Sequence, residues 1–302
     1  MRIDTHRSIN TTEVFEMSEQ CTPVDCESCG IDCSSRMAGE NPDFSAHLSK
    51  GSSVKHVYAV MSGKGGVGKS LVTTMLACAF AKAGHRTAIL DADITGPSIP
   101  KAFNVDRDGL KVTDDQLMVP VESKNGIRII SANLLLDNES DPIIWRGALI
   151  ASAVKQFYEE TLWEDIDYMF VDMPPGTGDV PLTVFQSLPV EGIIMVTSPQ
   201  DLVSMIVGKA VNMAKMMAKP VIGVVENMSY YECPDCGKKH SIFGDSHIDD
   251  VAQKFGLSVL AKLPIDTKTA ELIDQGRADE IDTTPMDKAV DVITTIAKFG
   301  SK

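Results

Sequence analysis

The sequence predicts an α/β fold in which a mostly parallel central sheet carries helices on both faces. Short runs of consecutive apolar residues alternate with longer helical segments, and uninterrupted apolar strands are typical of a parallel sheet that is covered on both sides. A glycine-rich loop follows the first of these runs and precedes the first helical segment. Most of the distinctive polar residues follow later strand ends, which is where ligands bind in sheets of this kind.

Composition limits the classes of protein to which the chain can belong. Its 302 residues are 43% hydrophobic and 23% charged, which suits one large or two small globular domains. The net charge of −14 argues against a nucleic-acid partner, because phosphates would repel the chain. No apolar run approaches the roughly 18 residues of a membrane-spanning helix. The first ten residues lack the apolar core of a signal peptide, so we expect a cytoplasmic protein with no membrane partner.

The first fifty residues differ from the rest of the chain. They hold four basic and nine acidic residues, show weak apolar periodicity and contain four of the seven cysteines. In the cytoplasm, cysteines serve as metal ligands or reactive thiols before they serve as disulfides. We therefore divide the chain into a flexible tail with a four-cysteine metal motif, residues 1–54, and a folded domain, residues 55–302.

The elements of the folded domain alternate in a regular order. Strands are expected at 57–61, 87–90, 168–171, 193–196, 221–225 and 258–263, where apolar residues run without interruption. Helices are expected at about 69–83 and over 145–160, 201–217 and 246–255. No internal repeat is present in the sequence.

The glycine-rich loop fits the Walker A pattern G-x-x-x-x-G-K-[ST]. Its glycines let backbone N–H groups surround phosphates, Lys69 neutralises the β- and γ-phosphate oxygens, and the Ser70 hydroxyl can ligate Mg²⁺. The pattern lies between an expected strand and an expected helix, which is the context that it requires. We therefore predict a P-loop ATPase domain that binds ATP through Gly63, Lys64, Gly65, Gly66, Val67, Gly68, Lys69 and Ser70.

Two further acidic motifs follow expected strands. Asp93 is the candidate for orienting the attacking water, whereas Asp91 is expected to hold a water on Mg²⁺. Asp172 opens the string DMPPGTGD at a strand end, as a Walker B aspartate does, and is expected to bind Mg²⁺ through water. The Gly176 N–H in the same string can contact the γ-phosphate. The alternative is that these aspartates only cap helices.

The end of the expected strand 221–225 supplies a candidate for base recognition. The carboxamide of Asn227 has the donor and acceptor that match N6 and N7 of adenine. Residues 264–266 can complete the base pocket. An asparagine that only forms a turn is the alternative for Asn227, and an ordinary turn is the alternative for 264–266.

Lys64 is a second lysine inside the loop, and it makes the loop resemble the deviant Walker A of the MinD/ParA/nitrogenase-reductase class. That resemblance implies a catalytic Lys64 that reaches across a dimer interface to the partner's nucleotide, as an arginine finger does. The chain is also similar, over about residues 55–300, to the Mrp/ApbC family of iron–sulfur cluster carrier ATPases. The motifs that carry this similarity are 63–70, 91–100, 145–147, 172–179, 227–229 and 233–236.

The family resemblance implies a slow ATPase that works as a homodimer. It also implies a labile [4Fe–4S] cluster that bridges the two subunits, with apo iron–sulfur proteins and cluster-assembly factors as further partners. Three other functions stay open on the residues alone: a MinD/ParA-type positioning ATPase with a structural zinc knuckle, an electron donor like nitrogenase reductase, and an inserter of another metal. A positioning ATPase would need a basic membrane- or DNA-binding segment.

Cys233 and Cys236 form a C-x-x-C-G knuckle in which Gly237 can take a positive φ. Two thiolates complete neither a zinc site nor a [4Fe–4S] site. The missing ligands can come from His240 and His247, from the tail cysteines, or from the same pair in a second subunit. The family resemblance favours the second subunit, whereas structural zinc or a redox pair are the alternatives.

The tail cysteines follow the pattern C-x4-C-x2-C-x3-C, so four thiolates can close around one cluster without help. They are Cys21, Cys26, Cys29 and Cys33. Structural zinc and unligated thiols are the alternatives. Family members with an N-terminal cluster space their four cysteines more widely, so this sequence departs from the family pattern here.

Overall fold

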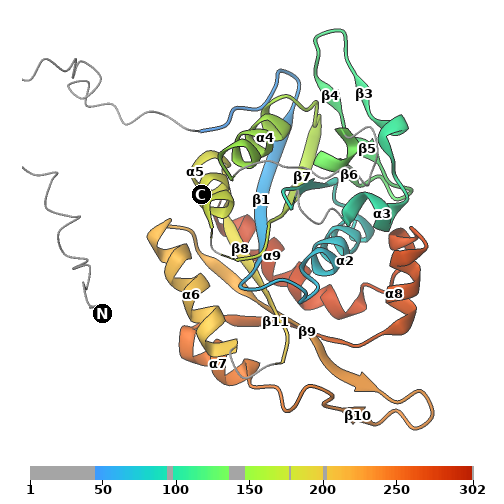
Figure 1. Cartoon of the computed structure of the whole chain (residues 1–302), viewed down its shortest axis with the longest axis vertical. Helices are drawn as coiled ribbons and strands as arrows, with labels where there is room; N and C mark the ends of the chain where they lie inside the picture. Colours follow the sequence, from blue (N-terminus) through green and yellow to red (C-terminus); the bar gives the residue numbers. More distant parts are fainter. Residues whose placement is uncertain (1–44, 94–97, 136–146, 177, 200–202, 301–302) are drawn as a thin grey trace, which may run out of the picture. The chain divides into compact units, whose positions relative to one another are not determined.

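A nine-stranded, mostly parallel sheet forms the centre of the part of the chain that the structure describes (Figure 1). This computed structural model describes residues 45–93, 98–135, 147–176, 178–199 and 203–300. The four tail cysteines therefore lie outside the described residues, as do residues 94–97 and 145–146 of the sequence motifs.

The centre of the sheet is β1 (Ser53–Ser62), which pairs in parallel with β7 (Asp165–Asp172) on one side and β8 (Gly192–Thr197) on the other. Beyond β7 come β2 (Thr87–Asp91), β6 (Arg128–Ser131) and the antiparallel β5 (Val121–Glu122). Beyond β8 comes β9 (Val221–Glu232), which pairs with the parallel β11 (Ser258–Pro264) and the antiparallel β10 (Lys239–His240). A separate hairpin joins β3 (Lys111–Val112) to β4 (Met118–Val119).

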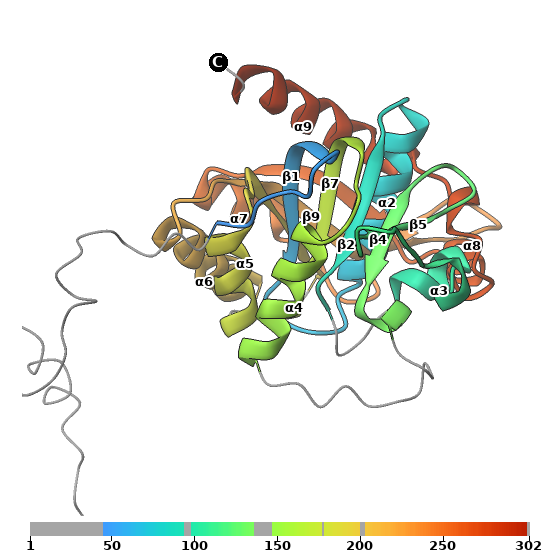
Figure 2. The same ribbon diagram turned by 90° about the horizontal axis from the view of Figure 1, so that it is seen from above.

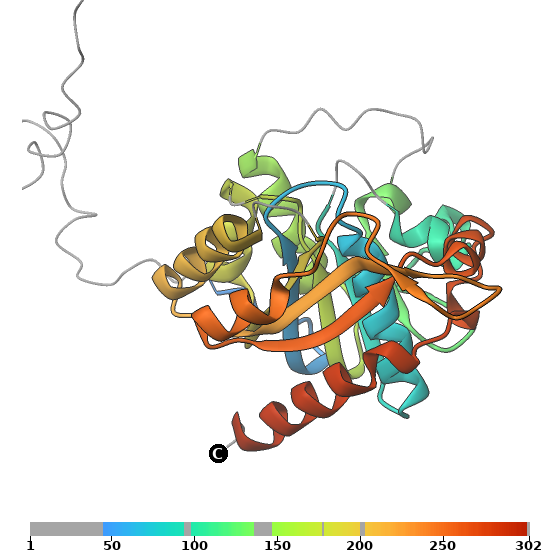
Figure 3. The same ribbon diagram turned by 90° about the horizontal axis from the view of Figure 1, so that it is seen from below.

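Helices cover both faces of the sheet, as predicted (Figures 2 and 3). One layer contains α2 (Lys69–Lys82), α3 (Ile99–Phe103), α8 (Thr267–Asp274) and α9 (Asp287–Gly300). The other contains α4 (Gly147–Glu159), α5 (Asp179–Ser187), α6 (Val203–Met216) and α7 (Ile248–Phe255). Among the described residues, no helix is both long enough and apolar enough to cross a membrane.

The strand β1 shows how the sequence builds two cores at once. Val57, Ala59 and Met61 pack against the layer that contains α4 to α7, whereas Tyr58 and Val60 pack against the layer that contains α2 and α9. Successive side chains of a strand point to opposite faces, so a continuous apolar run fills both cores.

All six expected strands and all four expected helices are present, although some boundaries differ. The expected strand at 221–225 continues to Glu232, because the polar residues that follow the apolar run stay buried within β9. Asn227 thus lies inside a strand and not after one, contrary to prediction. Helices α3, α5 and α8 and the short strands β3 to β6 and β10 have no counterpart in the expected elements.

Described residues on the N-terminal side of the boundary predicted after residue 54 already contact the folded domain. The backbone N–H of Ala46 donates to the Ser187 carbonyl at 2.8 Å, and the Ser49 hydroxyl donates to the Thr161 carbonyl at 2.8 Å. Residues 45–52 are therefore attached to the folded unit before β1 begins.

Candidate nucleotide site and cysteine hairpin

The Walker A loop connects β1 to α2 in the predicted way, and close packing requires glycine at two of its positions. Gly68 has a φ of +81°, and a Cβ there would lie 2.1 Å from Asn227 Nδ2. A Cβ on Gly63 would lie 2.0 Å from Ile206 Cγ2 in α6. The loop is thus held between β9 and α6, which leaves no room for side chains at these two positions.

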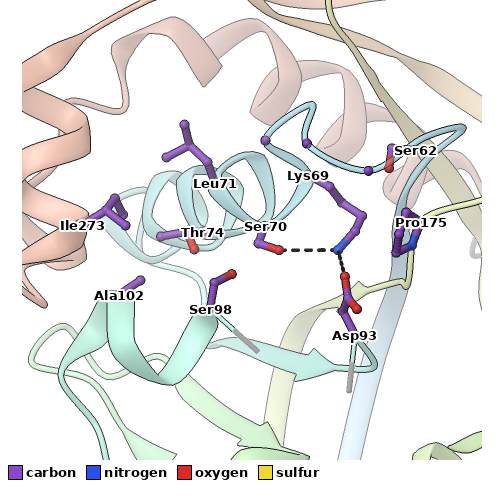
Figure 4. Close-up of a pocket in the computed structure, with 13 residues that line it drawn as sticks. Ser62, Lys69, Ser70, Leu71, Thr74, Asp93, Ser98, Ala102, Pro175 and Ile273 are labelled. Atoms are coloured by element: carbon purple, nitrogen blue, oxygen red, sulfur yellow. Dashed lines mark hydrogen bonds and ion pairs between the residues drawn. The ribbon is translucent and has the colours of Figure 1, made fainter. Parts of the chain in front are cut away.

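A cavity of about 470 Å³ opens over the loop and the start of α2 (Figure 4). It is lined by Ser62, Gly65, Gly66, Gly68, Lys69, Ser70, Leu71, Thr74, Asp93, Ser98, Ala102, Pro175 and Ile273. The side chains of Lys69, Ser70 and Asp93 point toward one another at its floor. Lys64 is not among the lining residues, although it belongs to the same loop.

Lys69 reaches from α2 to the carboxylates near the ends of β7 and β2. Its Nζ lies 2.9 Å from Asp172 Oδ2, 3.2 Å from Asp93 Oδ2 and 3.4 Å from Ser70 Oγ. Burial opposes the charged form, but attraction to Asp172, a hydrogen bond with it, and then Asp93 and Asp91 raise the pKa of Lys69 above its usual value. The ammonium is therefore kept charged, which is the state that binds phosphate oxygens.

Asp172 is fully buried, and hydroxyl groups hold both of its oxygens. The Ser70 hydroxyl donates to Oδ2 at 2.6 Å, and the Thr73 hydroxyl donates to Oδ1 at 2.7 Å. The structure therefore brings the predicted Walker A serine and Walker B aspartate together. Thr73 was missed, although it lies one turn after Ser70 on the same face of α2.

The oxygen donors of Ser70 and Asp172 fit the predicted magnesium site. Mg²⁺ prefers hard oxygen ligands, keeps several waters and takes further ligands from phosphates. Across the described ranges, no cluster of three or more His, Cys, Asp or Glu side chains could hold a metal ion by itself. A hydroxyl and a carboxylate beside a phosphate-binding loop suit Mg²⁺, which needs few ligands from protein.

Asp91 is the last residue of β2 and is buried beside Asp172. It accepts hydrogen bonds from the Ser131 hydroxyl at 2.8 Å and from the backbone N–H of Asp93 at 3.1 Å. Burial, and then repulsion by Asp172, raise the pKa of Asp91 well above its usual value, against the opposing effects of Ser131 and Lys69. Ionisation of the Asp91 carboxyl therefore destabilises the folded, nucleotide-free chain.

We expect Asp91→Asn to stabilise the nucleotide-free protein. Folding raises the pKa of Asp91. The contribution of this carboxyl to the stability of the folded protein is therefore fully present below its unfolded pKa and is lost as the pH rises through its folded pKa. Asparagine keeps an acceptor for the Asp93 N–H and can donate to Ser131. The gain should be roughly 0.5–2 kcal/mol and should grow with pH in melting curves between about pH 5 and 8. Asp108→Asn, at an exposed position, is the control, and a lower melting temperature at the upper pH would contradict the argument.

The Gly176 N–H, which was predicted to contact the γ-phosphate, has another acceptor here. It donates to the Ser62 carbonyl at 2.9 Å and so joins the loop after β7 to the end of β1. Gly176 has a φ of +92°, a region that glycine tolerates without strain. A contact of this N–H with phosphate stays a prediction and would require it to leave Ser62.

Asn227 holds the Walker A loop in place. Its Nδ2 donates to the Val67 carbonyl at 3.0 Å, so one of its two amide hydrogens is used. A second cavity, of about 260 Å³, includes Asn227, Leu71 and all three residues of the predicted base pocket, Pro264, Ile265 and Asp266. Leu71 also lines the cavity over the loop. The predicted base-pocket residues therefore share one cavity next to the phosphate loop, whereas adenine pairing by Asn227 stays a prediction.

Cys233 and Cys236 lie at the tip of a hairpin that continues β9 and returns through β10 (Figure 1). Gly237 has the expected positive φ, +67°, and its N–H donates to the Cys233 carbonyl at 2.8 Å. Hydrogen bonds from the backbone N–H groups of Asp235 and then Cys236, followed by one with the Cys236 side chain, lower the pKa of Cys233. This geometry favours a thiolate, the form that binds metals.

The hairpin supplies two thiol ligands and no third. Cys236 is exposed and Cys233 half-buried, while His240 and His247 are exposed. Since the described residues contain no group of three potential ligands, His240 and His247 do not complete the site in this structure. The tail cysteines, the other candidates within the chain, lie outside the described residues.

Comparisons with known proteins show the family to which the chain belongs. A family model described as ParA, NUBPL iron-transfer P-loop NTPase, matches residues 53–299. The iron–sulfur cluster carrier protein of Clostridium perfringens is 46% identical over 233 residues, which are 75% of this chain and 82% of the relative. That of Methanocaldococcus jannaschii is 37% identical over 262 residues, which are 86% and 89% of the two chains.

Solved structures of other proteins share this fold. A nucleotide-binding protein from Archaeoglobus fulgidus in complex with ADP has 40% identity and a TM-score of 0.69, over 76% of this chain and 89% of that one. The MinD cell division protein of Aquifex aeolicus has a TM-score of 0.52 over 82% and 98% of the two chains. Its identity of 18% shows a shared fold alone.

Proposed function

Because the chain belongs to the ParA family of NUBPL-type iron-transfer P-loop NTPases, we propose that it is an ATP-dependent carrier of iron–sulfur clusters. It binds a labile [4Fe–4S] cluster between two subunits and transfers it to apoproteins. The relatives from Clostridium perfringens and Methanocaldococcus jannaschii are named iron–sulfur cluster carrier proteins. Residues 53–299, which match the family model, include both the nucleotide site and the cysteine hairpin.

The cysteine hairpin is the observation that carries this proposal. It presents two thiols with the backbone geometry of a metal knuckle, yet the described chain offers no third ligand. A two-fold dimer would supply the other two thiolates with one symmetry operation. A cluster held in this way is shared by two chains, so separation of the chains would release it.

The residues of the nucleotide site account for ATP hydrolysis in the proposal. Lys69 binds the β- and γ-phosphate oxygens, and Asp93 exchanges its ion pair with Lys69 for a hydrogen bond to the attacking water. Ser70, and Asp172 through water, would hold Mg²⁺, which would supply positive charge beside the phosphates. Asn227 anchors the loop on which these groups depend.

Lys64 is proposed to act on the nucleotide of the partner subunit. Lys64→Ala should keep nucleotide affinity, because Lys64 does not line its own cavity, but should lower ATP turnover by roughly 10³-fold, as loss of an arginine finger does. A mixture of Lys64→Ala and Asp93→Ala chains should recover part of the activity. In the mixed dimer, one site has its own Asp93 and a Lys64 from the partner. A mixture as inactive as its components would contradict action between subunits.

The carrier function is tested by transfer. Full-length protein is reconstituted anaerobically with iron and sulfide and then mixed with an apo [4Fe–4S] enzyme, whose activity is followed with and without ATP. We expect recovery of that activity at a rate that depends on ATP. Stoichiometric zinc with no sulfide in the purified protein, together with failure to transfer, would favour the alternative of a positioning ATPase with a structural zinc knuckle.

A further inference from the structure

Glu226 is a buried acidic residue in β9 to which the nucleotide chemistry gives no role. Its side chain is 0% exposed. Its Oε2 accepts two hydrogen bonds, from the Ser229 hydroxyl at 2.5 Å and from the Ser246 hydroxyl at 2.6 Å. Among the described residues, its Oε1 has no hydrogen-bond partner. Burial of a polar group destabilises the folded state unless its hydrogen bonds are kept. The two serine hydroxyls therefore stabilise the fold around Glu226.

The two serines belong to the two arms of the cysteine hairpin. Ser229 is on the outgoing arm, within β9, and Ser246 is on the returning arm, just before α7. Cys233 and Cys236 lie between them. One carboxyl group therefore joins the two arms at their base, beneath the tip that carries the cysteines.

A backbone irregularity makes this arrangement possible. Residues three apart on a regular strand point to opposite faces, so Ser229 should face away from Glu226. Met228 has a φ of +57°, and between the pairs Glu226–Lys262 and Tyr230–Pro264 β9 advances by four residues while β11 advances by two. Such a bulge turns the following side chain, and here it brings Ser229 to the side of Glu226.

The same strand touches the nucleotide loop next to this point. Asn227, the neighbour of Glu226, donates to the Val67 carbonyl, and Cys233 follows six residues later. A regular strand rises about 3.3 Å per residue and β9 is bulged here, so the cysteine pair begins at most roughly 20 Å along the strand from the loop contact. The base of the hairpin is thus fixed close to the nucleotide site.

We propose that Glu226 is a positioning residue that clamps both arms of the cysteine hairpin, through Ser229 and Ser246, and thereby holds the Cys233–Cys236 pair in a fixed place relative to the nucleotide site. The value of this clamp for holding a cluster rests on the proposed function. The clamp itself is a property of the metal-free chain and can be measured without cluster or ATP.

Amide hydrogen exchange of the full-length, reduced, metal-free protein tests the clamp. Ser246→Ala should accelerate exchange across residues 229–246 by about tenfold or more, the effect of leaving a buried acceptor without one of its hydrogen bonds. Ser229→Ala should accelerate amide exchange across the same residues, although this substitution lies on the other arm. Ser246→Thr keeps the hydroxyl and should restore slow exchange. Exchange in β1 and β8, and the affinity for ADP, should stay as in the unchanged protein.

Ser241→Ala is the matched control, because Ser241 is an exposed serine on the same hairpin. The Ser246 hydroxyl also accepts from the Ile248 N–H at 3.4 Å, so it could serve only to begin α7. Acceleration confined to the start of α7, or no effect of Ser229→Ala, would overturn the clamp. Either result would leave the carrier function intact, because iron loading and cluster transfer test that function separately.

Discussion

Lys69→Ala is expected to cause a large loss of nucleotide affinity. Lys69 is the cation at the floor of the cavity, and its ammonium is kept charged by Asp172 and Asp93. Each charge-assisted hydrogen bond to phosphate is worth about 1.5–3 kcal/mol. Loss of the bonds to the β- and γ-phosphates should weaken ATP binding by roughly 10²- to 10⁴-fold. ADP has no γ-phosphate, so its binding should weaken by only roughly 10- to 10²-fold. Titration calorimetry with ADP and a non-hydrolysable ATP analogue measures the change.

The same substitution should make the nucleotide-free protein more sensitive to pH. Lys69 opposes the rise in the pKa of Asp91, so its removal raises that pKa further. Stability is then lost as the pH rises through the folded pKa of Asp91, and the melting temperature should fall more steeply toward high pH than in the unchanged protein. Lys215→Ala, which removes an exposed lysine of α6, controls for the loss of charge. Retained affinity in Lys69→Ala would refute the assignment of the phosphate site.

Replacing both Cys233 and Cys236 by alanine should eliminate the cluster at the hairpin. Each chain contributes half of the four thiolates, so the unchanged protein should load at most four irons per two chains there. The double variant should load none and should dimerise less, while its ADP affinity stays the same, because neither cysteine lines the nucleotide cavity. Iron and sulfide analysis with mass measurement in solution gives these quantities.

Cys78 provides a matched control for this experiment. It is buried in α2, its thiol donates to the Ala278 carbonyl at 3.4 Å, and burial raises its pKa to about 12. Cys78→Ala should therefore keep full iron loading. To separate the tail cysteines, the truncation should remove residues 1–43, since Ala46 and Ser49 are bonded to the folded unit. Full loading of the hairpin in a strict monomer would contradict the shared cluster.

The sequence predicts which side chains of the candidate nucleotide site lie close together, because the patterns that place them are local. A fixed spacing places Lys69 and Ser70 at the start of a helix, and continuous apolar runs place Asp91 and Asp172 at strand ends in one sheet. These side chains meet because parallel strands end at the same edge. The partners of Asp172 and Asp91 are less visible, since Thr73 and Ser131 are ordinary residues whose role depends on tertiary contacts.

The region after residue 225 could not be predicted in the same way. Glu226 and Asn227 look like the polar end of a strand, but their bonds with Ser246 and Val67 allow β9 to continue while they are buried. These partners lie far away along the chain, so no local pattern reveals them. The positive φ of Met228 also has no sequence signal, because glycine and asparagine are the usual residues there.

Two of the outer strands of the sheet, β5 and β11, restrict how a second copy can associate with this one. At one edge, β5 has two residues and follows Pro120, which lacks an N–H to donate. At the other edge, β11 ends at Pro264 and pairs with β9 in an irregular register. The Lys288 ammonium of α9 donates a hydrogen bond to the Val259 carbonyl of β11. Short, irregular or covered edges prevent a foreign strand from adding to the ladder, which is how native sheets avoid edge-to-edge aggregation. A homodimer of this chain should therefore form through side-chain contacts between faces and loops, without a sheet that continues across the interface.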